Sequence, residues 1–250
     1  MEYTNSSAYD NQTFYDNYMK RRHREENPND LIETPSLLEL LGSVKGKHVL
    51  DLGCGDASLG QLLMRLGCGE YQGVDGSANM IERASQNLQD AKGKGSVVHS
   101  NLQEFHYPAA SFALVVSQLV LHYIDDLEGI LENVMSTLKA NGKFVFSVQH
   151  PLLTASSESM KNGKRSNWIV DDYFVSGRRV EPWIGENVVK FHRTIEEYFM
   201  LLQSAGFVIE GLREATPIKE NFANIEEYER RRKIPLFLLF SCVKKNKAGE

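Results

Sequence analysis

Cysteine is scarce in this sequence and long apolar runs are absent, and each lack argues against a class of protein. The three cysteines, Cys54, Cys68 and Cys242, are odd in number and widely spaced, which argues against a disulfide framework and favours reduced thiols. The longest apolar run, at residues 236–240, is far too short to span a bilayer. The polar, acidic start of the chain is unlike a secretory signal. We therefore expect a cytoplasmic protein without a membrane partner.

Metal-ligand spacing and an excess of basic residues are also missing. The seven histidines show no spacing against Cys, Asp or Glu that is typical of a metal site, so none is expected. The formal net charge of -5 argues against nucleic acid as the main partner. Basic runs at residues 20–24 and 230–233 keep that option open, but both adjoin acidic residues and are interpreted as solvated helix faces.

The sequence does contain a regular alternation of apolar strands and amphipathic helices. The chain has 250 residues, of which 42% are hydrophobic, enough for the core of one large domain. Strands are predicted at residues 47–53, 71–76, 95–100, 111–118, 143–150, 207–214 and 235–245. Helices are predicted at residues 13–24, 34–42, 56–67, 77–89, 127–142, 195–206 and 225–232. This alternation predicts an α/β fold with a doubly wound, mainly parallel sheet.

The alternation stops at His150. Residues 151–193 are rich in Ser, Gly, Trp and Tyr with several turn signals, and they are too many for a structureless connector. We interpret 151–193 as an inserted substrate lid of short strands. Residues 1–250 then form a single domain, with an N-terminal helical cap at 1–45 and a core sheet at 46–150 and 194–245.

The stretch LDLGCGDASLG, residues 50–60, follows the first predicted strand, where a doubly wound sheet binds its ligand. Gly53 and Gly55 allow a ligand to approach the backbone closely. A G-x-G-x-x-G dinucleotide motif would need glycine where Ser58 stands, and a phosphate loop would need a lysine. Asp51 and Asp56 would repel a pyrophosphate. The turn therefore favours a ligand with positive charge and hydroxyl groups.

Asp75 ends the second strand, where a carboxylate can accept both hydroxyls of a ribose. A ribose and a cationic amino acid group beside one glycine turn indicate S-adenosylmethionine. The chain resembles class I S-adenosylmethionine-dependent methyltransferases, especially the small-molecule type that is similar to methyltransferase domains 11 and 25. The resemblance rests on VLDLGCGDASLG, GVDGSANMIERA, SFALVVSQLVLHYIDD and LKANGKFVFSV. It implies a seven-stranded Rossmann-like sheet of order 3-2-1-4-5-7-6 with strand seven antiparallel.

The resemblance also implies roles for single residues. Asp51 would orient the methionine amino group, Asp75 would hold the ribose, and Met80 would pack on the adenine. The full set of implied cofactor residues is Tyr18, Asp51, Gly53, Cys54, Gly55, Asp75, Gly76, Met80, Asn101, Leu102, Ser117 and Gln118. Two positions depart from the family pattern: Ala57 replaces a usual glycine, and Asn101 replaces a frequent aspartate.

Methyl transfer from a sulfonium needs mainly alignment and exclusion of water. A hydroxyl acceptor would also need a general base, and His150 and His192, at the two ends of the lid, are the candidates. Each could equally be a structural histidine. Trp168, Tyr173 and Trp183 could line an aromatic acceptor pocket or form the core of the lid.

The predicted reaction is methyl transfer to a small-molecule acceptor at oxygen, nitrogen or carbon, which yields S-adenosylhomocysteine. Three alternatives stay open: a tRNA or rRNA methyltransferase, a noncatalytic nucleoside-binding protein, and an NAD-dependent Rossmann protein.

Overall fold

The computed structural model describes residues 2–91, 93–156, 159 and 167–245. Its central sheet has seven strands in the order β4-β3-β2-β5-β6-β10-β9. They are β2 (His48–Leu52), β3 (Glu70–Asp75), β4 (Gly95–His99), β5 (Phe112–Gln118), β6 (Leu138–Gln149), β9 (Val208–Glu214) and β10 (Phe237–Val243). β10 is antiparallel to both its neighbours. This is the predicted order 3-2-1-4-5-7-6, so the sheet prediction is confirmed.

Helices cover both faces of the sheet because its inner strands are apolar on both sides. One layer consists of α2 (Thr34–Leu41), α3 (Ser58–Arg65) and α4 (Ala78–Asn87), which pack on residues such as Val49 and Val145. The other consists of α5 (Leu127–Thr137) and α7 (Ile195–Ser204), which pack on residues such as Phe144 and Phe240. No helix in the described ranges is long and apolar enough to cross a membrane.

The helix expected to run to Gly142 is shorter than predicted. α5 ends at Thr137, and Leu138 takes an extended backbone that pairs with Phe112 of β5. The apolar side chain at Leu138 fits the helical period but is buried as the first residue of β6. Strand pairing therefore takes precedence over the helical pattern at this point.

A second, smaller sheet joins the N-terminal cap to the segment predicted to form the lid. It has the order β1-β8-β7. β7 (Gly177–Trp183) and β8 (Glu186–His192) form an antiparallel hairpin, and β1 (Glu2–Tyr3) adds to β8 in parallel. The N-terminal cap and the segment 151–193 therefore share one sheet.

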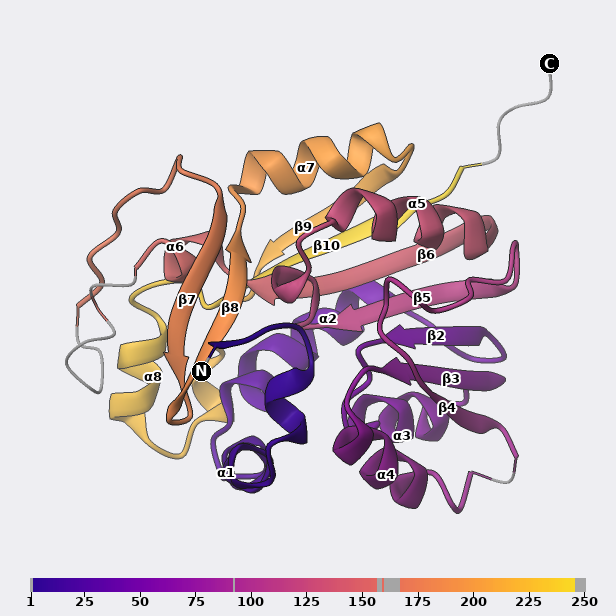
Figure 1. Ribbon diagram of the computed structural model, residues 1–250, viewed down its shortest axis with the longest axis horizontal. Helices are drawn as coiled ribbons and strands as arrows, with labels where there is room; N and C mark the ends of the chain where they lie inside the picture. Colours follow the sequence, from indigo (N-terminus) through magenta and orange to yellow (C-terminus); the bar gives the residue numbers. More distant parts are fainter. Residues whose placement is uncertain (1, 92, 157–158, 160–166, 246–250) are drawn as a thin grey trace.

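These covering segments gather at one end of the central sheet. In Figure 1 the arrowheads of β2, β3, β5 and β6 point toward the N-terminal segment and the hairpin β7–β8. The remaining elements are η1 (Ser7–Asp10), α1 (Gln12–Arg22), the π-helical turn η2 (Asn29–Glu33), η3 (Leu121–Tyr123), α6 (Pro151–Thr154), η5 (Lys219–Asn221) and α8 (Ile225–Arg231). The carboxyl ends of the parallel strands, where ligands bind in this architecture, are thus enclosed by the chain itself.

Candidate active site

A cavity with an empty volume of about 970 Å³ lies at the carboxyl ends of β2, β3 and β5. Five stretches of the chain form its wall: the N-terminal cap, the glycine turn after β2, the end of β3, the residues after β4 and the residues after β5. The cap is the only one of these that does not follow a strand of the central sheet. The cavity therefore lies where doubly wound sheets bind their ligands, and the N-terminal cap forms its roof.

Asp75 fixes the shape of the glycine turn. Its two carboxylate oxygens accept hydrogen bonds from the backbone amides of Gly55 and Ser77, both at 2.9 Å. Burial raises the pKa of Asp75, and the two amides act in the opposite direction. A carboxylate oxygen has further lone pairs, so Asp75 can still accept hydrogen bonds from a ligand on the cavity wall.

The glycines of the turn serve different purposes. Gly53 has φ +75°, and a Cβ there would lie 2.3 Å from Cγ2 of Val120. Gly55 has φ +54°, and a Cβ there would have no neighbour within 4 Å, so this backbone faces open space. Ala57, the residue that replaces a usual glycine, also has a positive φ of 59°. Ala57 therefore adopts the left-handed backbone that a glycine adopts readily, with more strain in the alanine.

Asp51 lies behind the turn and not on the cavity wall. Its side chain is buried and accepts a hydrogen bond from the Tyr71 hydroxyl at 2.8 Å. The other oxygen, Oδ1, has no hydrogen-bond partner in the described part of the chain. Burial, with a smaller contribution from Asp75, raises the pKa of Asp51 to about 7. A buried carboxyl group with a free oxygen is suited to a cationic ligand group nearby.

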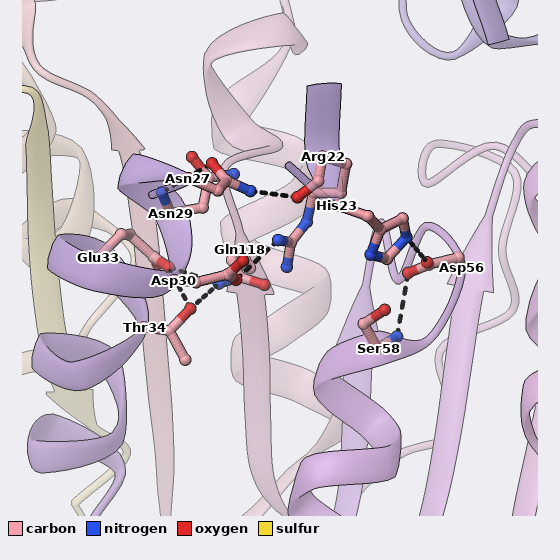
Figure 2. A network of polar contacts seen from close by, with 10 residues as sticks. All are labelled: Arg22, His23, Asn27, Asn29, Asp30, Glu33, Thr34, Asp56, Ser58 and Gln118. Carbon is pink, nitrogen blue, oxygen red and sulfur yellow. Dashed lines mark hydrogen bonds and ion pairs between the residues drawn. The ribbon is translucent and has the colours of Figure 1, made fainter. Parts of the chain in front are cut away.

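Polar contacts tie the cap to the glycine turn, as Figure 2 shows. His23, at the end of α1, lies 3.2 Å from Asp56, whose other oxygen accepts the amide of Ser58 at 3.1 Å. Arg22 pairs with Asp30 at 2.7 Å. The segment that links α1 to α2 is thereby held over the cavity.

Three tyrosines from two segments form an aromatic part of the wall. The Tyr9 and Tyr18 rings meet edge to face with centroids 4.9 Å apart. Tyr123, which follows β5, packs in the same cluster as Tyr9. Burial raises the pKa of all three phenols, so they stay neutral and can donate or accept hydrogen bonds.

A buried carboxyl group holds the last residue of β5 in place. Glu33 is fully buried and accepts a hydrogen bond from Nε2 of Gln118, which also donates to the Thr34 hydroxyl (Figure 2). Burial raises the pKa of Glu33 to about 7. The next residue, Leu119, has φ 58°, a strained value for a branched side chain and one that is frequent at functional sites. Gln118 and Leu119 both lie on the cavity wall.

Most of the expected cofactor residues lie on this wall. They are Tyr18, Gly53, Cys54, Gly55, Asp75, Gly76, Met80, Asn101, Leu102 and Gln118. Asp51 and Ser117 lie behind it, and the Ser117 hydroxyl donates to the carbonyl of Leu52 at 2.9 Å. Wall residues that the sequence analysis did not assign to the cofactor are Asn5, Ser6, Tyr9, Arg22, Asn29, Asp56, Ser58, Leu59, Gln103, Leu119, Val120, Tyr123 and Ile124.

The two candidate bases lie away from the cavity wall. His150 has Nε2 at 2.9 Å from Glu214, and its Nδ1 accepts the amide of Leu152 at 3.2 Å. His192 has Nδ1 at 2.6 Å from the Thr154 hydroxyl and Nε2 at 2.8 Å from the carbonyl of Tyr173. Burial lowers the pKa of both rings. Both nitrogens of each ring are engaged, so the contacts give the two histidines structural tasks, and their catalytic role stays a prediction.

The three candidate acceptor residues are separated from one another. Tyr173 packs its ring edge to face against His192, with centroids 5.6 Å apart, outside the cavity wall. Trp168 is half-buried in the lid and is likewise absent from that wall. Trp183, at the tip of the hairpin, belongs to a small apolar cluster with Tyr9, Tyr18 and Tyr123. Trp183 is thus the one of the three that packs with wall residues.

The wall fits S-adenosylmethionine. Asp75 offers carboxylate lone pairs for ribose hydroxyls, and the turn at Gly55 faces open space. Buried Met80 and Leu102 offer apolar surface for a base, and Asn101 offers an amide beside them.

Comparisons with known proteins show the family of the chain. Residues 50–146 match the family model of a methyltransferase domain. An uncharacterized protein from Haemophilus influenzae is 32% identical over 217 residues, which cover 83% of this chain and 85% of that protein. The crystal structure of an S-adenosylmethionine dependent methyltransferase from Mesorhizobium loti has a TM-score of 0.77 and 32% identity, covering 84% of this chain and 97% of that one. The chain belongs to the class I S-adenosylmethionine-dependent methyltransferases.

Within that class the protein is an enzyme that uses S-adenosylmethionine as its cofactor. Two relatives whose names specify O-methyl transfer match only part of the chain. A ubiquinone biosynthesis O-methyltransferase from Coxiella burnetii is 28% identical over 105 residues, 42% of this chain and 44% of that protein. A malonyl-[acyl-carrier protein] O-methyltransferase from Magnetococcus marinus is 34% identical over 101 residues, 40% of this chain and 37% of that protein.

Proposed function

We propose that this methyltransferase acts on a small-molecule acceptor by in-line displacement, within the cavity at the carboxyl ends of β2, β3 and β5. When bound, S-adenosylmethionine supplies a methyl group on a sulfonium, a carbon that is already activated. The protein's own residues then have three tasks: to hold the donor, to align the acceptor and to exclude water.

Different residues hold different parts of the methyl donor. Asp75 accepts the ribose hydroxyls, as its position beside Gly55 suggests. Met80 and Leu102 pack against the adenine, and the amide of Asn101 meets its edge. Asp51 acts from behind the turn, where its free oxygen favours the methionine ammonium group through an intervening water.

The observation that carries the choice of a small acceptor is the roof over the cavity. The cap is held to the glycine turn by His23 and Asp56, and to α4 by Asp10, which accepts from the Ser77 hydroxyl at 2.8 Å. Its tyrosines close the cavity with apolar rings. A polynucleotide substrate would need an open, positively charged groove, which a chain of net charge -5 does not favour.

An oxygen acceptor is the first to test. Two partial relatives carry names that specify O-methyl transfer. A carboxylate or an acidic hydroxyl needs little help from a general base, which suits a wall from which His150 and His192 are absent.

The test combines binding with turnover. Calorimetric titration should show binding of S-adenosylhomocysteine and none of NAD. A methyl-release assay against a panel of small acids, phenols and amines, with bulk tRNA and rRNA in parallel, should give a product that mass spectrometry identifies. Methylated RNA with no methylated metabolite would contradict the small-molecule proposal.

A further inference from the structure

Two segments from opposite ends of the sequence, each with a pair of arginines, touch outside the cavity. The amide of Asn224 donates to Glu26 at 2.6 Å, and the side chain of Asn221 donates to the carbonyl of Leu31 at 3.2 Å. The arginine cluster, as we call it, consists of Arg21 and Arg24 beside the end of α1 and Arg230 and Arg231 in the last turn of α8.

Within the part of the chain that the structure describes, the cluster has few ion-pair partners. Glu227 serves two of its members, at 2.8 Å from Arg230 and 3.6 Å from Arg231. Among the described residues, Arg21 and Arg24 form no ion pair. Burial, followed by repulsion from Arg230, lowers the pKa of Arg231 to about 10, and Arg24 and Arg21 act in the same direction.

Burial makes this repulsion costly. The side chains of Arg230 and Arg231 are only 21% and 13% exposed. The interpretation of residues 230–233 as a solvated helix face is therefore wrong for these two. Like charges that are close together and partly removed from water destabilise a fold unless a ligand or partner neutralises them. Converging guanidinium groups are the usual protein partners of carboxylates and phosphates.

The cluster continues into the hairpin tip through an aromatic ring. The Arg21 guanidinium lies 4.9 Å from the centroid of the Trp183 ring, and the Lys190 ammonium lies 5.4 Å from it. The indole N–H of Trp183 is buried and has no hydrogen-bond partner in the described part of the chain. The ring of Trp183 thus lies beside the arginine cluster and holds an indole donor that no described residue uses.

The cluster is also close to the cofactor cavity. Tyr18 and Arg22 of α1 lie on the cavity wall, and Arg21 is the next residue. Tyr18 and Arg21 both belong to α1, and with a rise of about 1.5 Å per residue they are separated by about 4.5 Å along the helix axis. A small molecule could reach from one to the other.

We propose that the arginine cluster is an anion-binding subsite for a carboxylate or phosphate group of the methyl acceptor, with Trp183 as the wall for its apolar part. This proposal rests on the proposed function, which it deepens by naming the charge of the acceptor. A small cluster on an acidic protein, with two of its four arginines partly buried, suits one anionic group, while a nucleic acid would need a broad basic surface.

Trp183 allows a direct binding test. The protein has two tryptophans, so Trp168→Phe leaves Trp183 as the sole emitter. Pyrophosphate and citrate are titrated separately at constant ionic strength set with sodium chloride, and the emission of Trp183 is followed. We expect a saturable change with one of the two, which distinguishes a phosphate subsite from a carboxylate subsite.

Matched variants locate the binding. Arg24→Gln and Arg231→Gln should each weaken the anion about tenfold, as expected for loss of a charge-assisted hydrogen bond. Arg24 is exposed, so its variant stays informative if Arg231→Gln folds poorly. Arg83→Gln is the control, because Arg83 lies on α4 and its described hydrogen bond goes to Gln86 at 3.2 Å; it should bind the anion as the parent does.

Three results would overturn the proposal: no saturable change with either anion, equal affinity in Arg24→Gln and the parent, or a response to an RNA oligonucleotide alone. S-adenosylhomocysteine is titrated into the same proteins. Normal cofactor binding without anion binding would refute the subsite alone, whereas loss of cofactor binding in the parent would refute the proposed function.

Discussion

The hairpin β7–β8 contains a buried ion pair whose removal should be costly. Lys190 Nζ lies 2.5 Å from Glu181, and the two side chains are 4% and 2% exposed. Lys190 also donates to the side chain of Gln149 at 2.8 Å, which joins the hairpin to the end of β6. The second oxygen of Glu181 has no partner in the described residues. The pair therefore has good contact geometry with incomplete hydrogen bonding.

Removing one charge and removing both should have different effects. Glu181→Gln keeps the shape of the side chain but leaves the buried ammonium unpaired, which should lower the free energy of unfolding by about 3–5 kcal/mol. The double variant Glu181→Leu with Lys190→Met removes both charges and keeps the volume, so it should lie within about 2 kcal/mol of the parent. The residual cost comes from Gln149, which loses its donor.

Urea denaturation followed by far-ultraviolet circular dichroism measures these values, provided that the slope with urea is the same for all variants. With the single variants Glu181→Leu and Lys190→Met added, the double-mutant cycle isolates the coupling between Glu181 and Lys190. A cost below about 1 kcal/mol for Glu181→Gln, or a double variant as unstable as the sum of the single ones, would refute the reasoning.

Three further predictions concern the cavity. Asp75→Ala should weaken S-adenosylhomocysteine binding in calorimetry by about 1.5–3 kcal/mol, and unchanged affinity would contradict the ribose assignment. Gly53→Ala should destabilise the fold by about 2–4 kcal/mol in urea denaturation because its Cβ would lie 2.3 Å from Val120, whereas Gly93→Ala, with a similar φ of +76° and no neighbour within 4 Å, should cost less. Burial raises the pKa of Asp51 to about 7. This is above its unfolded value of about 3.9, so the extra stability is complete below that value and lost as pH rises through the folded pKa. Between the unfolded and the folded pKa, the free energy of unfolding should therefore fall less steeply with pH in Asp51→Asn than in the parent. The same slope in both proteins would contradict this prediction.

The sequence predicted the sheet well because its signals are local, and the same signals placed the expected cofactor residues at the strand ends. Apolar runs, a glycine turn and Asp75 lie within short stretches whose order along the chain determines where they meet. The error at α5 arose where two local signals competed, since Leu138 fits both a helical period and a strand.

The roof of the cavity could not be predicted in the same way. β1 is two residues long, and its pairing with Asn187 and Val188 depends on a hairpin almost the whole chain away. Tyr9 lies on the wall through packing with Tyr18 and Tyr123. No periodicity links such positions. The arginine cluster is a similar case, because its two halves are separated by about two hundred residues of sequence.

The shared sheet β1-β8-β7 joins the roof of the cavity to the hairpin. The cap forms the roof of the cofactor cavity, and the hairpin contains Trp183 and the Glu181–Lys190 pair. Tyr3 and Val188 are paired across the two segments, so the hairpin cannot move far without moving the start of the chain. An acceptor held at the hairpin tip would restrain the cap through that pairing, and a closed cap would hold Tyr18 and Arg21 in place for the acceptor. Cofactor and acceptor binding would then favour each other, because each would offset part of the entropy cost of ordering the same cover.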